Sequence, residues 1–233
     1  MITLVKDKDT KKLEEAASHI IAQSIVKIIQ HDEKAVLAIP GGRSVAGIFS
    51  RLKEEKDVDW KKVHIFMVDE RLVPLDDENS NFKLANETFI KDLVKSGKLP
   101  EENVHPFKVN KKKKDFGVKD YEMELRGVHN HYDIILLSSG EDGHVGCLYP
   151  NHHSIKENNE DFVFMEDSPK PPKNRMGISK RMLLRSRVSI LLFFGEAKRH
   201  AFNKFMDPKT EQQHCPNTLV RKINHSYVLT DLV

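Results

Sequence analysis

The sequence predicts one α/β domain, built as three layers (α/β/α) around a mostly parallel, Rossmann-like sheet. Short, wholly apolar segments alternate along the chain with amphipathic helical segments, and this alternation is typical of a parallel sheet with helices on both faces. No internal repeat and no linker rich in serine, glycine or proline divides the 233 residues. We therefore expect a single domain over residues 1–233.

The first half of the chain opens with a predicted helix over residues 10–30, where apolar side chains recur with the 3.6-residue period. Asp9 or Thr10 can cap its first turn. A buried strand is expected over Ala35–Ile39, because the run is wholly apolar and a glycine turn follows it. The same alternation then predicts a helix over residues 44–55, a strand over 63–68 and a helix over 80–94.

The second half of the chain continues this alternation. Residues 119–126 predict a helix, and the mostly apolar run 132–137 predicts a strand. A further strand is expected over 188–194, a helix over 196–206 and a last strand over 225–229. Because open parallel sheets bind ligands at the carboxyl ends of their strands, the loops that directly follow these strands form the candidate site.

The charge balance does not favour a nucleic-acid partner. Lys and Arg number 38 against 35 Asp and Glu, which gives a net charge of +3, whereas nucleic-acid-binding proteins concentrate a strong basic excess. The four lysines at residues 111–114 lie in loop-like sequence. We interpret this run as a solvated surface.

Cysteine content and apolar runs indicate a cytoplasmic protein. Cys147 and Cys215 are too few for a disulfide framework and lack the spacing of a metal site. The N-terminus has no apolar stretch of the kind that a secretory signal needs. The longest apolar runs, 134–137 and 190–194, are far shorter than the roughly 20 residues of a membrane helix. We expect no membrane partner, and a monomer or weak homo-oligomer.

The first candidate loop, residues 40–44, contains Gly41, Gly42, Arg43 and Ser44. Glycines let the backbone approach an anion closely, and the start of the following helix supplies free N–H donors. Arg43 could offer a fork of donors, and Ser44 could cap the helix or bind an oxygen. Taken alone, the segment could equally be a tight turn with a helix cap.

The second candidate loop places Asp69 and Glu70 beside Arg71, directly after a predicted buried strand. An arginine at a strand end can hold an anion or stabilise a developing negative oxygen. Asp69 and Arg71 could also simply pair with neighbouring side chains. The loop by itself does not decide between these alternatives.

The third candidate loop, residues 138–144, is the most informative. Asp142, Gly143 and His144 follow a strand through a turn of small residues, and Gly140 leaves room for a ligand. A carboxylate two residues from a histidine can fix the tautomer of the imidazole and raise its basicity. This loop therefore favours His144 as a functional residue.

Four sequence blocks carry a resemblance to a known family. They are PGGRS at residues 40–44, VDERLVP at 68–74 followed by Ser80 and Asn81, GEDGHVGCLYP at 140–150, and DSPKPPKNR at 167–175. In this order and spacing, over nearly the whole chain, they resemble the 6-phosphogluconolactonases. That family is related to the glucosamine-6-phosphate deaminases and shares their sugar-phosphate isomerase/deaminase-like α/β/α fold.

The resemblance implies hydrolysis of 6-phospho-D-glucono-1,5-lactone to 6-phosphogluconate, in the oxidative pentose phosphate pathway, without a metal or a cofactor. It assigns the general base to His144 and places Arg71 in the charged active centre, while Asp142 would orient the imidazole. The glycine loop and Arg175 would hold the 6-phosphate. The residues expected to contact substrate are Gly41, Gly42, Arg43, Ser44, Asp69, Asn81, Gly140, Gly143, Lys173 and Arg175.

The chain departs from the family pattern at a few loop positions. Ser138 stands where a glycine is usual, Gly146 and Cys147 replace an Ala-Ser pair, and Val45 stands where proline is common. The related deaminases carry a glutamate at the position of Tyr149 and a tyrosine at the position of Arg71. These last two differences favour the lactonase.

Three other functions remain as alternatives. The first is a deaminase-like isomerase, which Tyr149 and Arg71 disfavour. The second is a non-catalytic sugar-phosphate-binding protein, which would use the same pocket without turnover. The third is metal-dependent hydrolysis, disfavoured because the candidate ligands lack a fixed carboxylate partner in the sequence. Those candidate ligands are His129, His131, His152 and His153.

Overall fold

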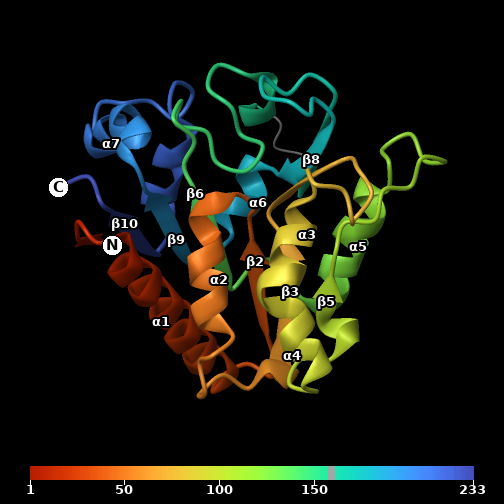
Figure 1. Ribbon diagram of the computed structural model, residues 1–233. Coiled ribbons are helices and arrows are strands. Elements are labelled where there is room, and N and C mark those ends of the chain that lie inside the picture. Colours follow the sequence, from red (N-terminus) through yellow and green to blue (C-terminus); the bar gives the residue numbers. More distant parts are fainter. Residues whose placement is uncertain (157–160) are drawn as a thin grey trace.

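A parallel sheet of seven strands forms the middle layer of the molecule (Figure 1). The computed structural model describes residues 1–156 and 161–233. Within these residues the strand order is β1–β10–β9–β6–β2–β3–β5, and neighbouring strands run parallel. The strands are β1 (Ile2–Lys6), β2 (Ala35–Ile39), β3 (Val63–Met67), β5 (Val104–His105), β6 (Ile134–Ser138), β9 (Val188–Phe193) and β10 (His225–Thr230). The predicted fold class is confirmed.

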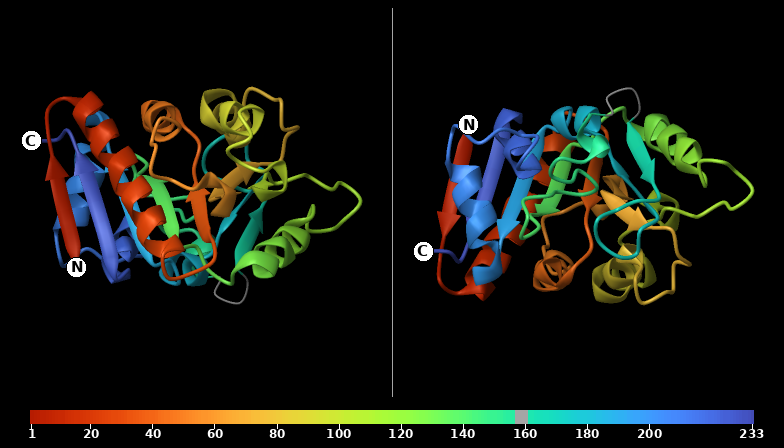
Figure 2. Two further views of the ribbon diagram at one scale, coloured as in Figure 1. Left: turned by 90° about the horizontal axis from the view of Figure 1, so that it is seen from below. Right: turned by 90° about the horizontal axis from the view of Figure 1, so that it is seen from above.

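Helices cover both faces of this sheet and complete the three layers. The helices are α1 (Thr10–Ile29), α2 (Ala46–Leu52), α3 (Asn81–Ala85), α4 (Lys91–Lys95), α5 (Val118–Val128), α6 (Lys180–Leu184) and α7 (Arg199–Met206). Figure 2 shows α1, α2 and the α3–α4 segment on one face and α5 and α6 on the other. The apolar strands explain this arrangement, because β2 is buried at every position and needs cover on both sides.

The predicted helices and strands all occur, with some shifted ends. Helix α1 begins where expected, and its N-cap is Asp9, whose Oδ1 accepts the Lys11 N–H at 2.9 Å. The helix expected over 80–94 is α3 and α4 joined by a π-helical segment, Asn86–Ile90. The helix expected over 44–55 is shorter, because a 3-10 turn at Arg43–Val45 precedes α2.

Several short elements were not predicted from the sequence. Strand β1 pairs with β10 at the edge of the sheet, and most of its side chains are exposed, so it lacks the apolar run of a buried strand. A second, antiparallel sheet consists of β4 (Asp69–Arg71), β8 (Arg175–Ile178) and β7 (Phe162–Met165). These strands, like β5 and α6, are too short for a periodic pattern to stand out.

The antiparallel sheet lies at the carboxyl end of β3. Val68, between β3 and β4, donates its N–H to Ile39 O at 2.8 Å and accepts the Ile178 N–H at 3.0 Å. In the β4–β8 ladder, Arg71 lies opposite Arg175. This sheet therefore brings the residues after β3 and the segment 167–175 to the edge where β2 ends.

A hydrophobic core fills the space between the sheet and the helices. Its largest fully buried side chains include aromatic rings from both sides, such as Phe49 of α2, Phe66 of β3 and Phe193 of β9. In the described part of the chain, none of the helices combines the length and apolar character needed to cross a bilayer.

Candidate functional site

The loops that follow β2 and β6 are neighbours at one edge of the parallel sheet. Lys198 Nζ donates a hydrogen bond to Ser138 Oγ at 2.7 Å and lies 3.5 Å from Ser44 Oγ. Ser44 belongs to the glycine loop (residues 40–44), and Ser138 opens the histidine loop (residues 138–144). One lysine thus contacts both loops, as expected where parallel strands end together.

The segment after β3 reaches the glycine loop through Asn81. This residue is buried, and its Nδ2 donates to Asp69 O at 2.8 Å. A β-carbon at position 41 would lie only 1.9 Å from Asn81 Oδ1, so the close approach requires Gly41. The three candidate loops therefore share one edge, and Asn81 packs two of them together.

His144 and Asp142 form a hydrogen-bonded pair. His144 Nδ1 lies 2.6 Å from Asp142 Oδ1, and the His144 backbone N–H donates to the same oxygen at 3.2 Å. Burial alone would raise the pKa of Asp142, but hydrogen bonds from the His144 ring and backbone and the charge of Lys170 hold this pKa well below its usual range. The ionised carboxylate keeps a proton on Nδ1, which leaves Nε2 of the neutral ring as a proton acceptor.

Neighbouring groups fix the position of this pair. The Tyr149 ring packs on the His144 ring, with 4.8 Å between centroids. Burial raises the pKa of Tyr149 to about 12, and its hydroxyl accepts a hydrogen bond from Ser168 Oγ at 3.1 Å. A β-carbon at Gly140 would lie 2.1 Å from His144 Nδ1 and 2.6 Å from an Asp142 oxygen. Glycine at this position is therefore a requirement of the pair.

Gly143 turns the chain between the two members of the pair. Its φ of +91° lies in the left-handed region that favours glycine, and a β-carbon there would lie 2.5 Å from Cys215 Sγ. Its carbonyl accepts the Asn217 N–H at 2.9 Å. Gly143 is buried, so the structure gives it a backbone role.

The glycine loop presents exposed backbone at the same edge. Gly42 has a φ of +97°, and no atom lies within 4 Å of the position that its β-carbon would take. Gly42 and Arg43 are exposed, whereas Ser44 is half-buried beside Lys198. A backbone with open space in front of it, followed by a helical turn, suits the approach of an anion.

Lys198 is a functional candidate that the sequence analysis missed. It ends the 3-10 turn Glu196–Lys198, which follows β9 at the same edge of the sheet. Burial lowers the pKa of Lys198 to about 8. The rule used for the other three loops also applies to this fourth strand end and would have found the residue. Its ammonium group, between Ser44 and Ser138, is placed to bind an anion.

Arg71 lies half-buried at the end of β4. Its Nη1 donates to Asn79 O, and its Nε is buried without a hydrogen-bond partner among the described residues. The adjacent Glu70 has a structural role, because its buried carboxylate accepts the backbone N–H groups of Arg71, Asn81 and Phe82. The other acid of this loop, Asp69, is also buried, and its Oδ2 lies 3.8 Å from Arg175 Nη1.

Arg175 is buried and organises the segment 167–175. Its Nε donates to Pro172 O and its Nη2 to Pro171 O, both at 2.9 Å. These bonds occupy much of the guanidinium, so the expected phosphate contact from Arg175 remains a prediction. Lys173 is exposed, and Lys170 of the same segment lies 3.8 Å from Asp142 Oδ2.

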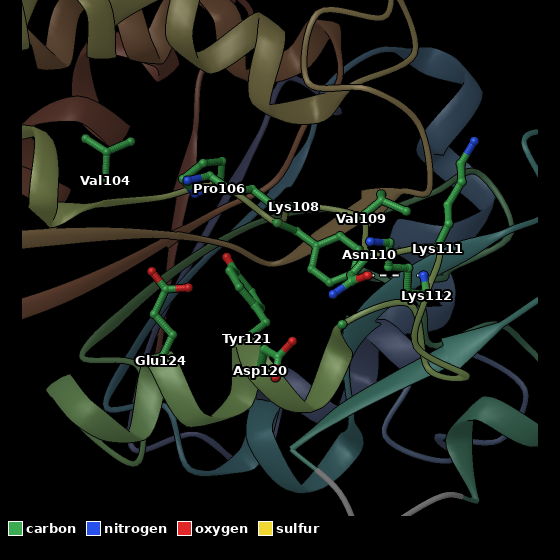
Figure 3. Close-up of a pocket in the computed structure, with 12 residues that line it drawn as sticks. Val104, Pro106, Lys108, Val109, Asn110, Lys111, Lys112, Asp120, Tyr121 and Glu124 are labelled. Atoms are coloured by element: carbon green, nitrogen blue, oxygen red, sulfur yellow. Dashed lines mark hydrogen bonds between the residues drawn. The ribbon is translucent and has the colours of Figure 1, made fainter.

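A cavity of about 640 Å³ lies outside this site, between residues 104–112 and α5 (Figure 3). Lys108, Lys111 and Lys112 line it together with apolar side chains, and no lining residue belongs to the three loops. The lysines at 111–114 are all exposed, as their composition predicts. Size alone therefore does not mark the candidate site in this molecule.

The comparison with known families agrees with the motifs. The model of the family of glucosamine-6-phosphate isomerases and 6-phosphogluconolactonases matches residues 8–229. The chain belongs to this family. Within the family, a 6-phosphogluconolactonase from Borreliella burgdorferi is 30% identical over 204 residues, which cover 88% of the chain and 86% of that protein.

Solved structures of family members share the fold. A 6-phosphogluconolactonase from Thermotoga maritima matches with a TM-score of 0.81 at 26% identity, covering 99% of this chain and 98% of that one. A monomeric glucosamine-6-phosphate deaminase matches with a TM-score of 0.79 at 20% identity, covering 98% and 96%. The fold is thus common to both activities, and the residues of the site must distinguish them.

Proposed function

We propose that the chain hydrolyses 6-phospho-D-glucono-1,5-lactone to 6-phosphogluconate, the lactonase step of the oxidative pentose phosphate pathway. The observation that carries this proposal is the 2.6 Å contact between His144 Nδ1 and Asp142 Oδ1, which leaves Nε2 as a general base. The 6-phosphogluconolactonases from Borreliella burgdorferi and Thermotoga maritima support the choice of substrate.

In the proposed reaction, His144 Nε2 removes a proton from a water molecule as the water oxygen attacks the lactone carbonyl. Asp142 stabilises the imidazolium that forms. The carbon–oxygen bond of the ring then breaks, and the imidazolium returns its proton to the departing ring oxygen, which becomes a hydroxyl group. The products are the open-chain acid and a regenerated neutral histidine. General base catalysis of this kind typically contributes about 10²–10⁴ in rate.

Cationic groups are assigned to the two remaining tasks, which are stabilising the oxyanion and holding the phosphate. Arg71 has guanidinium donors left over and lies opposite Arg175 in the β4–β8 ladder, so we assign it to the oxyanion of the tetrahedral intermediate. We assign the 6-phosphate to the glycine loop, with Lys198, Ser44 and Arg43. Holding the phosphate fixes the distance between the lactone carbonyl and the base, which lowers the entropy cost of the reaction.

The alternatives fit the site less well. The resembling deaminases carry a glutamate where Tyr149 stands, and a buried phenol whose pKa is raised to about 12 does not replace a carboxylate as a proton carrier. A non-catalytic binding protein has no need for a histidine oriented by an ionised aspartate.

We further propose that residues 1–233 form one domain that acts in the cytoplasm as a monomer or weak homo-oligomer. Both cysteines are free and buried, which supports a reducing compartment.

The test is a coupled assay on freshly prepared 6-phosphoglucono-δ-lactone, with the rate of spontaneous hydrolysis subtracted. Release of 6-phosphogluconate should be proportional to enzyme concentration and should vanish almost completely in His144→Ala. Glucosamine 6-phosphate serves as the competing substrate. Turnover of glucosamine 6-phosphate without lactone hydrolysis would overturn the proposal in favour of the deaminase. Saturable binding of 6-phosphogluconate without any turnover would favour the binding protein.

A further inference from the structure

We propose that His129, His131 and Asp133 bind one divalent transition-metal ion of the zinc class. This cluster lies at the amino end of β6, whereas the candidate active site lies at the carboxyl end of the same strand. At about 3.3 Å per residue, the five residues of β6 separate the two by roughly 17 Å. The metal site is therefore distinct from the residues assigned to lactone hydrolysis.

The chain conformation places the three side chains together. Helix α5 ends at Val128, and His129 is already extended, with φ −147° and ψ 165°. The chain then bends at Asn130, His131 and Asp133 before β6 begins, and these bends bring the ligand atoms of His129, His131 and Asp133 to within 4.8 Å of one another. The sequence identifies the two histidines as candidate ligands without a fixed carboxylate partner. The structure supplies that partner, which is Asp133.

The distances between ligand atoms fit a metal ion. Asp133 Oδ2 lies 3.1 Å from His129 Nδ1, and Asp133 Oδ1 lies 3.1 Å from His131 Nε2. Metal–nitrogen bonds of about 2.0–2.1 Å in a tetrahedral site place neighbouring ligand atoms about 3.3 Å apart. All three ligand groups lie within 4.8 Å of one another. An ion can therefore enter with only small side-chain movements.

Asp133 is held rigidly in place as a ligand. Its side chain is completely buried, and it accepts hydrogen bonds from the Val36 N–H at 2.8 Å and from Arg187 Nη1 at 3.0 Å. Arg187 also pairs with Asp32 at 2.5 Å. The carboxylates of Asp32 and Asp133 and the guanidinium of Arg187 together carry one net negative charge. This charge lies beside the histidines and favours binding of a cation.

The histidines are oriented as ligands and remain accessible. Asn130 Oδ1 lies 3.0 Å from His131 Nδ1 and can accept a proton carried there, and in that tautomer the Nε2 lone pair points toward Asp133, ready for a metal ion. Metal-bound histidines commonly donate their other ring N–H to an oxygen in this way. The side chains of His129 and His131 are 20% and 26% exposed, so an ion can enter from solvent and keep a water ligand.

A second cluster of the chain, formed by His152, His153 and Asp167, fits an ion less well. The Ser154 N–H donates to His152 Nδ1 at 3.3 Å, so the proton of a neutral ring lies on Nε2, the atom that faces Asp167. That nitrogen then has no lone pair to offer. The Asp167 side chain is also 61% exposed and hence poorly fixed. This cluster supplies a matched control within the same protein.

The test is titration of the chelator-treated full chain with Zn²⁺, followed by calorimetry, and with Co²⁺, followed by visible absorption. We expect saturable binding of one ion per chain and the visible bands of a low-coordinate cobalt site. His129→Ala and His131→Ala should each weaken binding at least about tenfold, because even loss of a group that merely supports a ligand costs about 10–100-fold. His153→Ala should bind as the wild type does.

Circular dichroism of each variant checks that the fold is intact, and Asp133 is left unchanged because its removal would leave Arg187 and the Val36 N–H without their partner. The proposal is overturned if the wild type shows no saturable uptake of Zn²⁺. It is equally overturned if His153→Ala loses the ion, or if His129→Ala and His131→Ala bind it with unchanged affinity. None of these outcomes depends on lactonase activity, so this inference and the proposed function fail separately.

Discussion

A carboxylate bonded to one nitrogen of an imidazole determines what the other nitrogen can do. The 2.6 Å contact from Asp142 holds a proton on His144 Nδ1 and leaves Nε2 free to accept one, as the proposed reaction with water requires. Sequence analysis could find both residues, because they lie two positions apart in one loop. It could not find the Tyr149 ring that packs on His144, because aromatic contacts between loop residues leave no periodic pattern.

His144→Ala should lower the turnover number by about 10²–10⁴, because it removes the proposed base, which would act in the transition state. Affinity for the product 6-phosphogluconate should change little, since the proposed phosphate anchors remain. Steady-state kinetics on the lactone and calorimetry with the product measure the two effects separately. A variant that binds the product much more weakly, yet turns over at the wild-type rate when saturated, would show that His144 is a binding residue.

The affinity for 6-phosphogluconate should fall as pH rises, because the pKa of Lys198 is lowered to about 8 by burial. Between pH 7 and 9 the protonated fraction of a group with this pKa falls about tenfold, so the product should bind about tenfold more weakly at pH 9. Calorimetry with 6-phosphogluconate avoids the base-catalysed breakdown of the lactone.

Lys198→Arg is the matched control for this dependence, because a guanidinium stays charged at pH 9. Its affinity for the product should be nearly constant over the same range. If Lys198→Arg and the wild type lose affinity in parallel, another group carries the effect. The position of Lys198 after a strand could be predicted from the sequence, but its contacts could not, because Ser44 and Ser138 lie 154 and 60 positions away.

At the scale of elements, the turns decide whether the site forms. Gly140→Ala places a β-carbon 2.1 Å from His144 Nδ1, so the pair must move apart, and a misplaced base loses most of its effect. We expect a loss of at least about 10²-fold in kcat with the secondary structure retained. Gly127→Ala is the control: it lies in α5 with no atom near its β-carbon position, so activity should persist and stability should rise slightly.

Activity and circular dichroism of the two alanine variants measure this contrast. Wild-type activity in Gly140→Ala would mean that the histidine loop can make room for the added methyl group. The His144–Asp142 pair would then not depend on close packing against Gly140. The glycines themselves could be read from the sequence. The atoms they make room for could not, because Asn81 lies against Gly41 through contacts made only in the folded chain.

The segment 167–175 depends on the geometry of one guanidinium. Arg175 bonds two carbonyls, those of Pro171 and Pro172, and a lysine cannot reproduce that fork. Arg175→Lys should therefore raise KM for the lactone by up to about a hundredfold, because a displaced segment positions the substrate poorly. Lys173→Ala should change KM less, because Lys173 is exposed. An unchanged KM in Arg175→Lys would show that this segment does not help to bind substrate.

At the scale of the whole molecule, the buried layers were predictable and the additions at their edges were not. Strands β2, β3, β6 and β9 are buried on both faces, which explains their apolar runs. Helix α1 is buried on one face, which explains its 3.6-residue apolar period. Strand β1 owes its existence to pairing with β10 more than 200 residues away, and the β4–β8–β7 sheet joins segments about 100 residues apart. Such pairings depend on tertiary contacts, which local sequence patterns do not encode.

Acid should destabilise the fold at the β3–β5 edge of the parallel sheet. Burial first, and then the nearby charge of His105, lower the pKa of His64 from 6.5 to about 4, and His64 Nδ1 lies 2.9 Å from His105 Nε2. The unfolded chain therefore binds a proton at this position below about pH 6.5, while the folded chain does so only near pH 4. The contribution of His64 to stability is intact above about pH 6.5 and is lost progressively as the pH falls toward 4.

His64→Gln should remove this dependence, because glutamine does not titrate. Urea unfolding of the wild type and the variant at pH 7.5 and 4.5 gives the difference in the free energy of unfolding at each pH. We expect the wild type to lose about 1–2 kcal/mol more than the variant over this interval, after allowance for the partial exposure of the ring. Groups remote from residue 64 titrate equally in both proteins and cancel, whereas His105, 2.9 Å from His64, is coupled to it, so the difference measures the His64–His105 pair. An equal loss in wild type and variant would show that His64 accepts its proton in the folded state without strain, and that the β3–β5 edge does not limit stability in acid.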